Sequence, residues 1–122
     1  MSNVWDNLTN AKHIDKVLAH SALNPKKWVA RFGPAREACL PRRAVWDTSR
    51  VAARNAAWNA AWMNAGAGRV RVAVWDAIQT LIAYDDCGYL LDFTPQQIHL
   101  YACLGVPAAV LLEPAVKAMY YD

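Results

Sequence analysis

The stretch VAARNAAWNAAW, residues 51–62, constrains the fold of this chain more tightly than any other part of the sequence. It contains six alanines, the strongest helix formers, and no proline or glycine that would end a helix. At about 100° per residue, its side chains separate into two apolar surfaces with polar strips between them. The bulky surface carries Val51, Trp58 and Trp62, and the small surface carries Ala52, Ala53, Ala56, Ala60 and Met63. An ordinary surface helix has one apolar stripe, so we expect this helix to be central or to use its second side for a partner.

Helical spacing and helix-ending residues recur through the rest of the sequence, and no convincing strand pattern occurs. Thr94 and Pro95, with Gln97 in the capping-box position, open one helix, and Pro114 lies inside or kinks the last one. We expect helices over 4–22, 25–32, 43–65, 69–84, 94–105 and 106–122, with a compact connector at 33–43 and a turn region at 84–93. The sequence therefore predicts a single all-α domain, 1–122, built as a compact bundle of five or six helices with one long central Ala/Trp-rich helix.

Composition places the chain among globular proteins, because 56% of its residues are hydrophobic and 19% are charged. No apolar run approaches the roughly 18 residues needed to cross a bilayer, and the first residues lack the pattern of a secretory signal. Cys39, Cys87 and Cys103 are widely spaced and odd in number, which is typical of reduced and mostly buried thiols. We therefore expect a cytoplasmic protein with no membrane partner, no bound metal and no cofactor.

The net charge of +3 conceals an asymmetric distribution. Residues 26–71 hold ten basic and two acidic residues, a net charge of +8, whereas residues 72–122 hold one basic and six acidic residues, a net charge of −5. Such asymmetry indicates an anion-binding face, or an electrostatic contact between halves of the chain or between protomers. It is equally compatible with simple solvation of an exposed surface.

The polar strips of the Ala/Trp-rich helix support two interpretations. In the first, the tryptophans belong to the core, and the arginines are solvated or paired with acidic residues. In the second, indoles flanked by guanidinium groups form a recognition surface, because indoles stack on flat groups and guanidinium groups bind phosphate or carboxylate through paired hydrogen bonds. The candidate ligand-binding residues are Arg50, Arg54, Trp58, Trp62, Asn55 and Asn59, with Arg42 and Arg43 near the start of the helix.

No constellation typical of an enzyme or a metal site emerges from the sequence. There is no phosphate-binding glycine loop. His13 and His20 lie two helical turns apart, about 10 Å, which is too far to share a metal. Asp85 and Asp86 are typical of a helix-ending turn. We therefore expect a protein that is not an enzyme, unless a site is assembled from residues distant in the sequence.

Two segments of the sequence, 52–62 (AARNAAWNAAW) and 74–116 (VWDAIQTLIAYDDCGYLLDFTPQQIHLYACLGVPAAVLLEPAV), resemble a group of small bacteriophage proteins of unassigned function. Those proteins carry tandem Ala/Trp/Arg/Asp/Asn tetrads, then a LIAYDD segment, a short helix opening on Thr-Pro and a Pro-rich apolar end. The resemblance covers roughly residues 43–117; this chain has fewer tetrads, and its basic residues 26–43 are not part of the resemblance. The resemblance brings no catalytic or ligand residues. It implies a small phage protein that binds something of the host's in the host cytoplasm, and antagonism of an antiviral defence is one such function.

Three binding functions follow from these observations. The first is a non-catalytic counter-defence sponge, a homo-oligomer that sequesters an anionic nucleotide signal at the Arg/Trp/Asn surface, with protomers meeting through the small alanine surface. The second is a protein-binding inhibitor that covers a host defence enzyme or a CRISPR-type effector through the basic face of residues 26–71. The third, nucleic-acid binding, is weaker because no helix-turn-helix pattern accompanies the basic charge. We favour the sponge slightly, because Trp, Arg and Asn adjoin on one helix.

Overall fold

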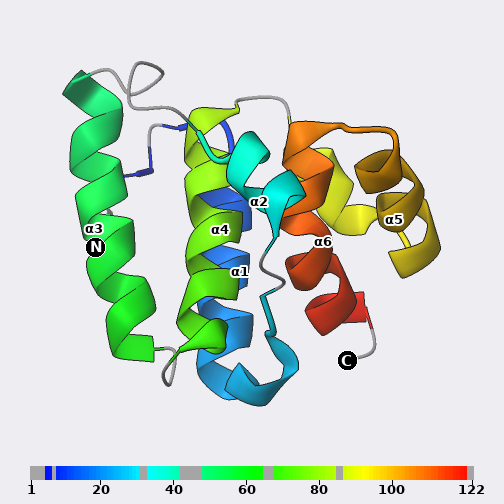
Figure 1. Cartoon of the computed structure of the whole chain (residues 1–122). Helices are drawn as coiled ribbons and strands as arrows, with labels where there is room; N and C mark the ends of the chain where they lie inside the picture. The colour runs from blue at the N-terminus through cyan, green and yellow to red at the C-terminus, as the bar shows by residue number, and fades with distance from the viewer. Residues whose placement is uncertain are drawn as a thin grey trace.

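Helices form all the regular structure in the computed structural model over the residues that it describes: 5, 6, 8–30, 33–41, 48–64, 68–84 and 87–120. In chain order the elements are α1 (Ala11–Leu23), η1 (Pro25–Lys27), α2 (Pro34–Cys39), α3 (Thr48–Asn64), α4 (Arg69–Ala83), η3 (Gly88–Asp92), α5 (Pro95–Cys103) and α6 (Pro107–Tyr120), where η1 and η3 are short 3-10 helices (Figure 1). These helices pack against one another. The predicted all-α bundle is therefore confirmed.

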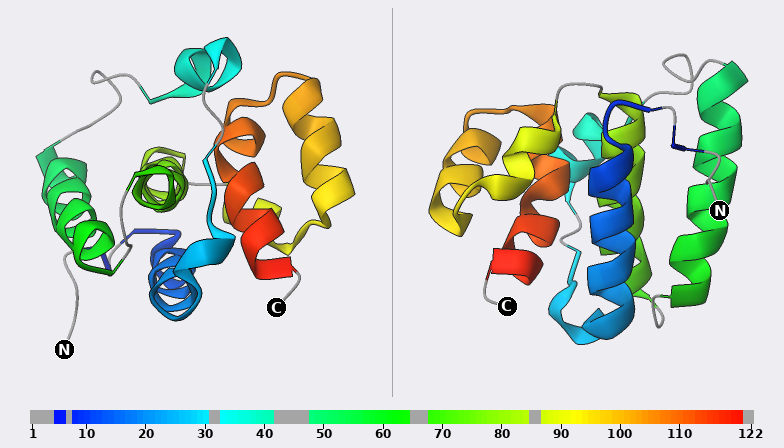
Figure 2. Two further views of the ribbon diagram at one scale, coloured as in Figure 1. Left: turned by 60° about the horizontal axis from the view of Figure 1, so that its bottom comes forward. Right: turned by 180° about the vertical axis from the view of Figure 1, so that it is seen from behind.

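Helix α4 occupies the centre of the bundle, with α1, α3 and α6 packed around it (Figure 2). Every residue of α4 from position 76 to its end is buried, so this part of the helix is surrounded on all sides. The Ala/Trp-rich helix α3, which we expected to be central, lies at the edge of the bundle (Figure 1). Its alanines are too small to fill a core on two sides, whereas the valine, isoleucine and leucine side chains of α4 do so.

Three alanines spaced one turn apart, Ala53, Ala57 and Ala61, form the buried stripe of α3. Such small side chains allow a neighbouring helix axis to approach closely, and α3 contacts both α4 and α1. The buried side of α3 is therefore rotated about the helix axis from the small apolar surface that the sequence predicts. Two residues of that predicted surface face solvent: Ala52 is exposed, and Met63 is 86% exposed. Of the predicted small surface, only Ala53 is buried inside the chain, and Ala56 and Ala60 are half-buried.

The side chain of Asn10 ties the start of α1 to the end of α4. Its Nδ2 donates to the carbonyl oxygens of Leu81 at 3.0 Å and Tyr84 at 2.9 Å, at the C-terminal end of α4, where carbonyl groups lack partners within the helix. Gly88 packs so closely on Asn10 and His13 that no Cβ would fit at this position. The N-terminal helix is thus fastened across the chain by polar contacts that the apolar pattern does not reveal.

Segments before α3 differ most from their predicted boundaries. α1 begins at Ala11 rather than at residue 4, and within the described residues 25–30 of the helix expected over 25–32 only the single turn η1 is helical. The backbone of Trp28 is extended, and its indole is fully buried and donates to Nδ1 of His20 at 3.1 Å. Burial of this large side chain outweighs the local helix preference. Helix α2 forms within the region expected to be a connector, with Pro34 in its first turn.

The boundaries after α4 agree closely with the sequence. Thr94 Oγ1 accepts from the amide of Gln97 at 3.2 Å, and Gln97 Oε1 accepts from the amide of Thr94 at 2.9 Å, so the predicted capping box is confirmed. Gly105 supplies the positive φ of 84° in the turn that follows α5. Pro114 lies inside α6, where it cannot donate the usual hydrogen bond to the carbonyl of Val110.

The three thiols occupy different environments. Cys87 is buried, Cys39 is half-buried and Cys103 is exposed. The expectation of mostly buried cysteines therefore holds only for Cys87. Among the described helices, none has both the length and the apolar character needed to cross a membrane.

Candidate functional site

A cluster of tryptophan and arginine side chains lies where α3 meets α4, and we call it the tryptophan–arginine face. It comprises Arg54, Trp58 and Trp62 of α3 with Arg71 and Trp75 of α4. The Trp58 and Trp75 rings meet edge to face, with centroids 4.7 Å apart, and the Trp58 and Trp62 centroids are 5.2 Å apart. Trp58 and Trp62 remain 39% and 42% exposed. The two indoles are therefore partly open to solvent, rather than core residues as one interpretation of the sequence proposed.

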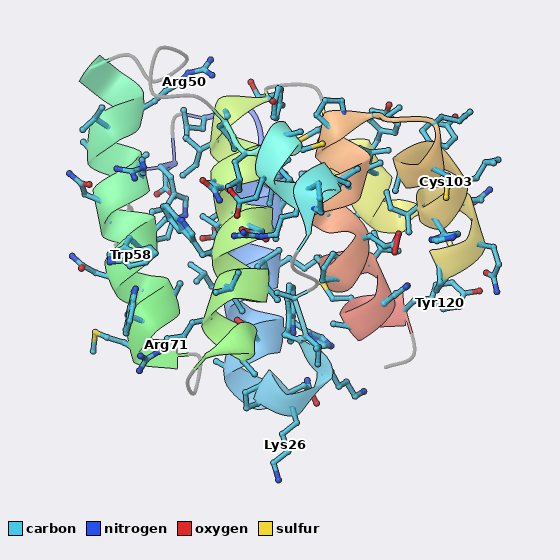
Figure 3. The ribbon with its side chains drawn as sticks, in the orientation of Figure 1. Lys26, Arg50, Trp58, Arg71, Cys103 and Tyr120 are labelled. Atoms are coloured by element: carbon cyan, nitrogen blue, oxygen red, sulfur yellow. The ribbon has the colours of Figure 1, made fainter. Side chains whose placement is uncertain are left out.

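Two guanidinium groups lie over the indole rings of this face. The Arg71 guanidinium is 3.9 Å from the centroid of the Trp62 ring, and the Arg54 guanidinium is 5.6 Å from that of Trp75. A guanidinium group is attracted to the negative face of an indole ring, by about 0.5–1 kcal/mol at exposed sites. These contacts hold positive charge beside flat aromatic surface. Figure 3 shows Trp58 and Arg71 along the α3–α4 seam.

The two helices that form this face contribute few negative charges. Helix α3 contains no acidic residue. In α4 the one acidic residue is Asp76, which binds Arg36. The Arg71 Nε atom is buried and, within the described part of the chain, has no hydrogen-bond partner. The charged side chains of the face itself, Arg54 and Arg71, are therefore both positive.

Arg50 has a different role from the one the sequence suggested. Its Nη1 atom donates to the carbonyl oxygens of Ile82 at 3.2 Å and Ala83 at 3.0 Å, at the C-terminal end of α4. Positive charge at a helix C-terminus is favourable because the exposed carbonyls make that end negative. Arg50 thus fastens α3 to α4 at the upper end of the seam (Figure 3).

Of the remaining predicted site residues, the structure describes two. Asn55 and Asn59 are exposed on α3. Arg42 and Arg43 lie outside the described residues. Sequence reasoning missed Arg71 and Trp75, although their spacing of four residues places them on one side of a helix. Only the packing of α3 on α4 shows that this side meets the tryptophans of α3.

A cavity of about 630 Å³ lies on the other side of α4, between α2, α5, α6 and the chain before α2. Its wall combines apolar groups with charged ones. The lining residues are Lys27, Val29, Gly33, Ala35, Arg36, Asp76, Ala102, Cys103, Val110, Glu113, Pro114 and Lys117. This volume falls within the range of about 300–1,000 Å³ that is typical of small-molecule sites.

Buried charges line one part of this cavity. Arg36 binds Asp76 through two hydrogen bonds, and Gln79 Nε2 donates to Asp76 Oδ1 at 3.2 Å. Burial raises the pKa of Asp76, and the hydrogen bonds from Arg36 act against that rise. The pKa of Arg36 is raised by its hydrogen bond to Asp76. The paired contacts are therefore those of an ion pair.

A chain of four polar side chains lies at another part of the wall, and three of them, Cys103, Glu113 and Lys117, line the cavity. The Cys103 Sγ is 3.5 Å from His99 Nε2, and His99 Nδ1 is 3.1 Å from Glu113 Oε1. Lys117 Nζ is 3.1 Å from the other oxygen, Glu113 Oε2. Burial acts to raise the pKa of Glu113, but hydrogen bonds from Lys117 and His99 outweigh it and hold the pKa below its usual value. Glu113 is thus a carboxylate, which can only accept hydrogen bonds.

Part of the cluster of Cys103, His99, Glu113 and Lys117 could be recognised from the sequence. His99 and Cys103 are four residues apart, a spacing that places them together on a helix. Glu113 comes from the next helix, and only the antiparallel packing of α5 and α6 brings it to His99 (Figure 1). Over the residues that the structure describes, no group of three His, Cys, Asp or Glu side chains is arranged to hold a metal ion.

Comparison of the chain with models of protein families, with curated proteins and with solved structures finds no match.

Proposed function

We propose that this chain is a binding protein that sequesters an anionic nucleotide-type ligand on the tryptophan–arginine face, without catalysing a reaction there. The observation that supports it most directly is the position of the Arg71 guanidinium 3.9 Å above the Trp62 ring, beside the partly exposed Trp58. This arrangement sets positive charge next to a flat aromatic surface. A nucleotide carries the complementary pair of features, a flat base and a negative phosphate.

The two parts of such a ligand would bind different residues. The base would stack on the exposed indole of Trp58 or Trp62, and stacking of this kind contributes about 1–3 kcal/mol per base. The phosphates would approach Arg54 and Arg71, whose guanidinium groups form paired hydrogen bonds with phosphate oxygens. Arg50 would act indirectly, because it holds α3 in position on α4.

The resemblance to small bacteriophage proteins supplies a setting for this activity. A phage protein that removes a nucleotide signal from the host cytoplasm would disarm a defence that depends on that signal. Such a protein needs high affinity for the nucleotide and a high concentration in the cell, but it does not need to convert the nucleotide to a product. We therefore place the proposed activity among counter-defence functions.

Calorimetric titration of the purified protein with cyclic mononucleotides and cyclic dinucleotides tests the proposal. Arg71→Met keeps an apolar side chain over Trp62 but removes the charge, and it should weaken binding at least about tenfold, or about 1.4 kcal/mol. Trp58→Ala should weaken binding at least as much. Lys12→Ala, an exposed substitution on α1, is the matched control and should bind normally.

Two results would count against the proposal in different ways. Normal binding by the folded Arg71→Met and Trp58→Ala variants would reject the tryptophan–arginine face as the site. Failure of all these nucleotides to bind, together with no nucleotide retained in native mass spectra of protein purified from infected cells, would reject the function.

A protein-binding inhibitor is the second candidate, and the exposed apolar side chains of α3 favour it. Val51, Trp58, Trp62 and Met63 are 40%, 39%, 42% and 86% exposed. Tryptophan and arginine are the residues most enriched at the energetic centres of protein interfaces. An inhibitor that uses the basic face of residues 26–71 predicts stoichiometric co-purification with one host protein. That complex should be lost in Met63→Asp and should be indifferent to added nucleotides.

A further inference from the structure

We propose that Cys103 is a nucleophilic thiol that accepts an acyl group, with His99 as its general base and Glu113 as the residue that positions His99. The three side chains lie beside the 630 Å³ cavity, whose wall includes Cys103 and Glu113. Helix α4 separates this cluster from α3 and its tryptophans (Figures 1 and 3). The inference is independent of the nucleotide-binding function.

The hydrogen-bond geometry assigns a role to each ring nitrogen of His99. Glu113 is a carboxylate and only accepts, so His99 Nδ1 carries the proton and donates to Oε1 at 3.1 Å. In the neutral ring, Nε2 then has a lone pair, and this atom is 3.5 Å from the Cys103 Sγ. A nucleophile, a base and an acidic group that orients the base are the three parts of an activated nucleophile.

The position of Glu113 is fixed from both sides. Its side chain is only 9% exposed, and Lys117 binds the oxygen that His99 does not use. The carboxylate therefore cannot rotate away without losing one of two charge-assisted hydrogen bonds. His99 is itself 55% exposed, so this hold on its Nδ1 is what keeps Nε2 directed at Cys103.

The reaction requires no group beyond the substrate and water. The Cys103 thiol loses its proton to His99 Nε2 while the sulfur attacks the carbonyl carbon of an ester or thioester. The bond from that carbon to the leaving oxygen or sulfur breaks, and the imidazolium returns the proton to the leaving group. The product is an acyl thioester on Cys103, which water hydrolyses if His99 then activates it in the same way.

The cavity wall indicates the class of substrate. Val29, Ala35, Ala102 and Val110 provide an apolar surface for a short acyl chain. The charged lining residues are Lys27, Arg36 and Lys117 against Asp76 and Glu113, a net charge of +1 that suits a substrate with an anionic part. We therefore assign a small acyl ester or thioester that carries a carboxylate or phosphate.

Acetylation by p-nitrophenyl acetate, followed by peptide mass spectrometry, tests the proposal on the whole protein. Cys103 should be acetylated at least about tenfold faster in the wild type than in His99→Ala, since general-base assistance typically contributes 10²–10⁴-fold. Cys103→Ser should form no thioester at this position. Gln96→Ala, an exposed change on the same helix, is the matched control and should leave the rate unchanged. The half-buried Cys39 serves as an internal reference for general thiol reactivity.

Glu113→Gln separates a positioning role from a merely structural one. We expect acetylation of Cys103 to slow severalfold, and nitrogen NMR of the His99 ring to change from one tautomer, protonated at Nδ1, to a mixture. An unchanged acetylation rate in folded His99→Ala would overturn the proposal. An unchanged ring tautomer in folded Glu113→Gln would overturn the role of Glu113.

Discussion

Arg36 and Asp76 join α2 to α4 through two hydrogen bonds, from Nε to Oδ2 at 2.7 Å and from Nη2 to Oδ1 at 2.9 Å. The Asp76 side chain is 3% exposed and that of Arg36 is 15% exposed. A six-residue helix is too short to be stable alone. This buried pair therefore contributes to holding α2 on the bundle and shapes one wall of the cavity.

Removal of the Arg36 side chain should destabilise the protein by about 3 kcal/mol, because it leaves a buried carboxylate without its cation. Chemical denaturation of Arg36→Ala measures this loss. Glu37→Ala is the control: Glu37 also contacts Arg36 but is 68% exposed, so its loss should cost less than about 1 kcal/mol. In the double variant Arg36→Ala/Asp76→Ala the losses should not add, and full additivity would show that the two residues act separately.

Enlargement of the alanine stripe should separate α3 from α4. Ala57 is completely buried, so Ala57→Leu forces extra methyl groups into the contact and should cost about 1–3 kcal/mol. Ala52→Leu places the same side chain on the exposed side of the same helix and should change stability by less than about 0.5 kcal/mol. Equal melting temperatures for the two variants would contradict the orientation of α3.

A methyl group at position 88 should loosen the attachment of α1. Gly88→Ala brings a Cβ into contact with Asn10 and His13, and we expect a loss of about 1–3 kcal/mol. Amide hydrogen exchange should rise first around the start of α1 and the end of α4. Gly33→Ser is the comparison, because a Cβ at Gly33 meets nothing within 4 Å and serine is a favourable N-cap residue.

The stability contribution of Glu113 should depend on pH in a defined direction. Its pKa in the folded protein is lower than the usual 4.5, so the ionised carboxylate stabilises the fold. This contribution is complete above the unfolded-state pKa and is lost as the pH falls through the folded-state pKa. Glu113→Gln should therefore cost about 2 kcal/mol at neutral pH and much less in acid below both pKa values. A difference from the wild type that stays constant with pH would disprove the charge-assisted role.

Where contacts between neighbouring residues determine an element, its position could be predicted from the sequence alone. Thr94 and Gln97 satisfy each other's backbone amides within four residues, so the start of α5 could be recognised without any tertiary information. The apolar side of α4 was equally clear, since its residues repeat at helical spacing. Contacts between residues distant in the sequence determine where the remaining elements begin and end. Trp28 leaves a predicted helix because burial of its indole is worth more than one turn of helix.

The candidate sites could be predicted only in part for the same reason. Trp58 and Trp62 were recognisable as unusual on an alanine-rich helix, yet their contacts with Trp75 and Arg71 depend on how α4 packs. His99 and Cys103 share a helix, but the third member of their cluster belongs to another. The contact of Arg50 with α4 could not be predicted, because its partners, the carbonyl oxygens that end α4, are backbone atoms that side-chain patterns do not reveal.

The hydrogen bonds from Asn10 to Leu81 and Tyr84 span 71 and 74 residues of sequence. A ribosome therefore completes α1 long before it makes the helix that covers its apolar side. Helices α5 and α6, by contrast, are neighbours in the sequence and pair soon after both have emerged. Helix α1 must wait for α4, and its isoleucine and valine side chains stay exposed to chaperones and to other nascent chains during that interval.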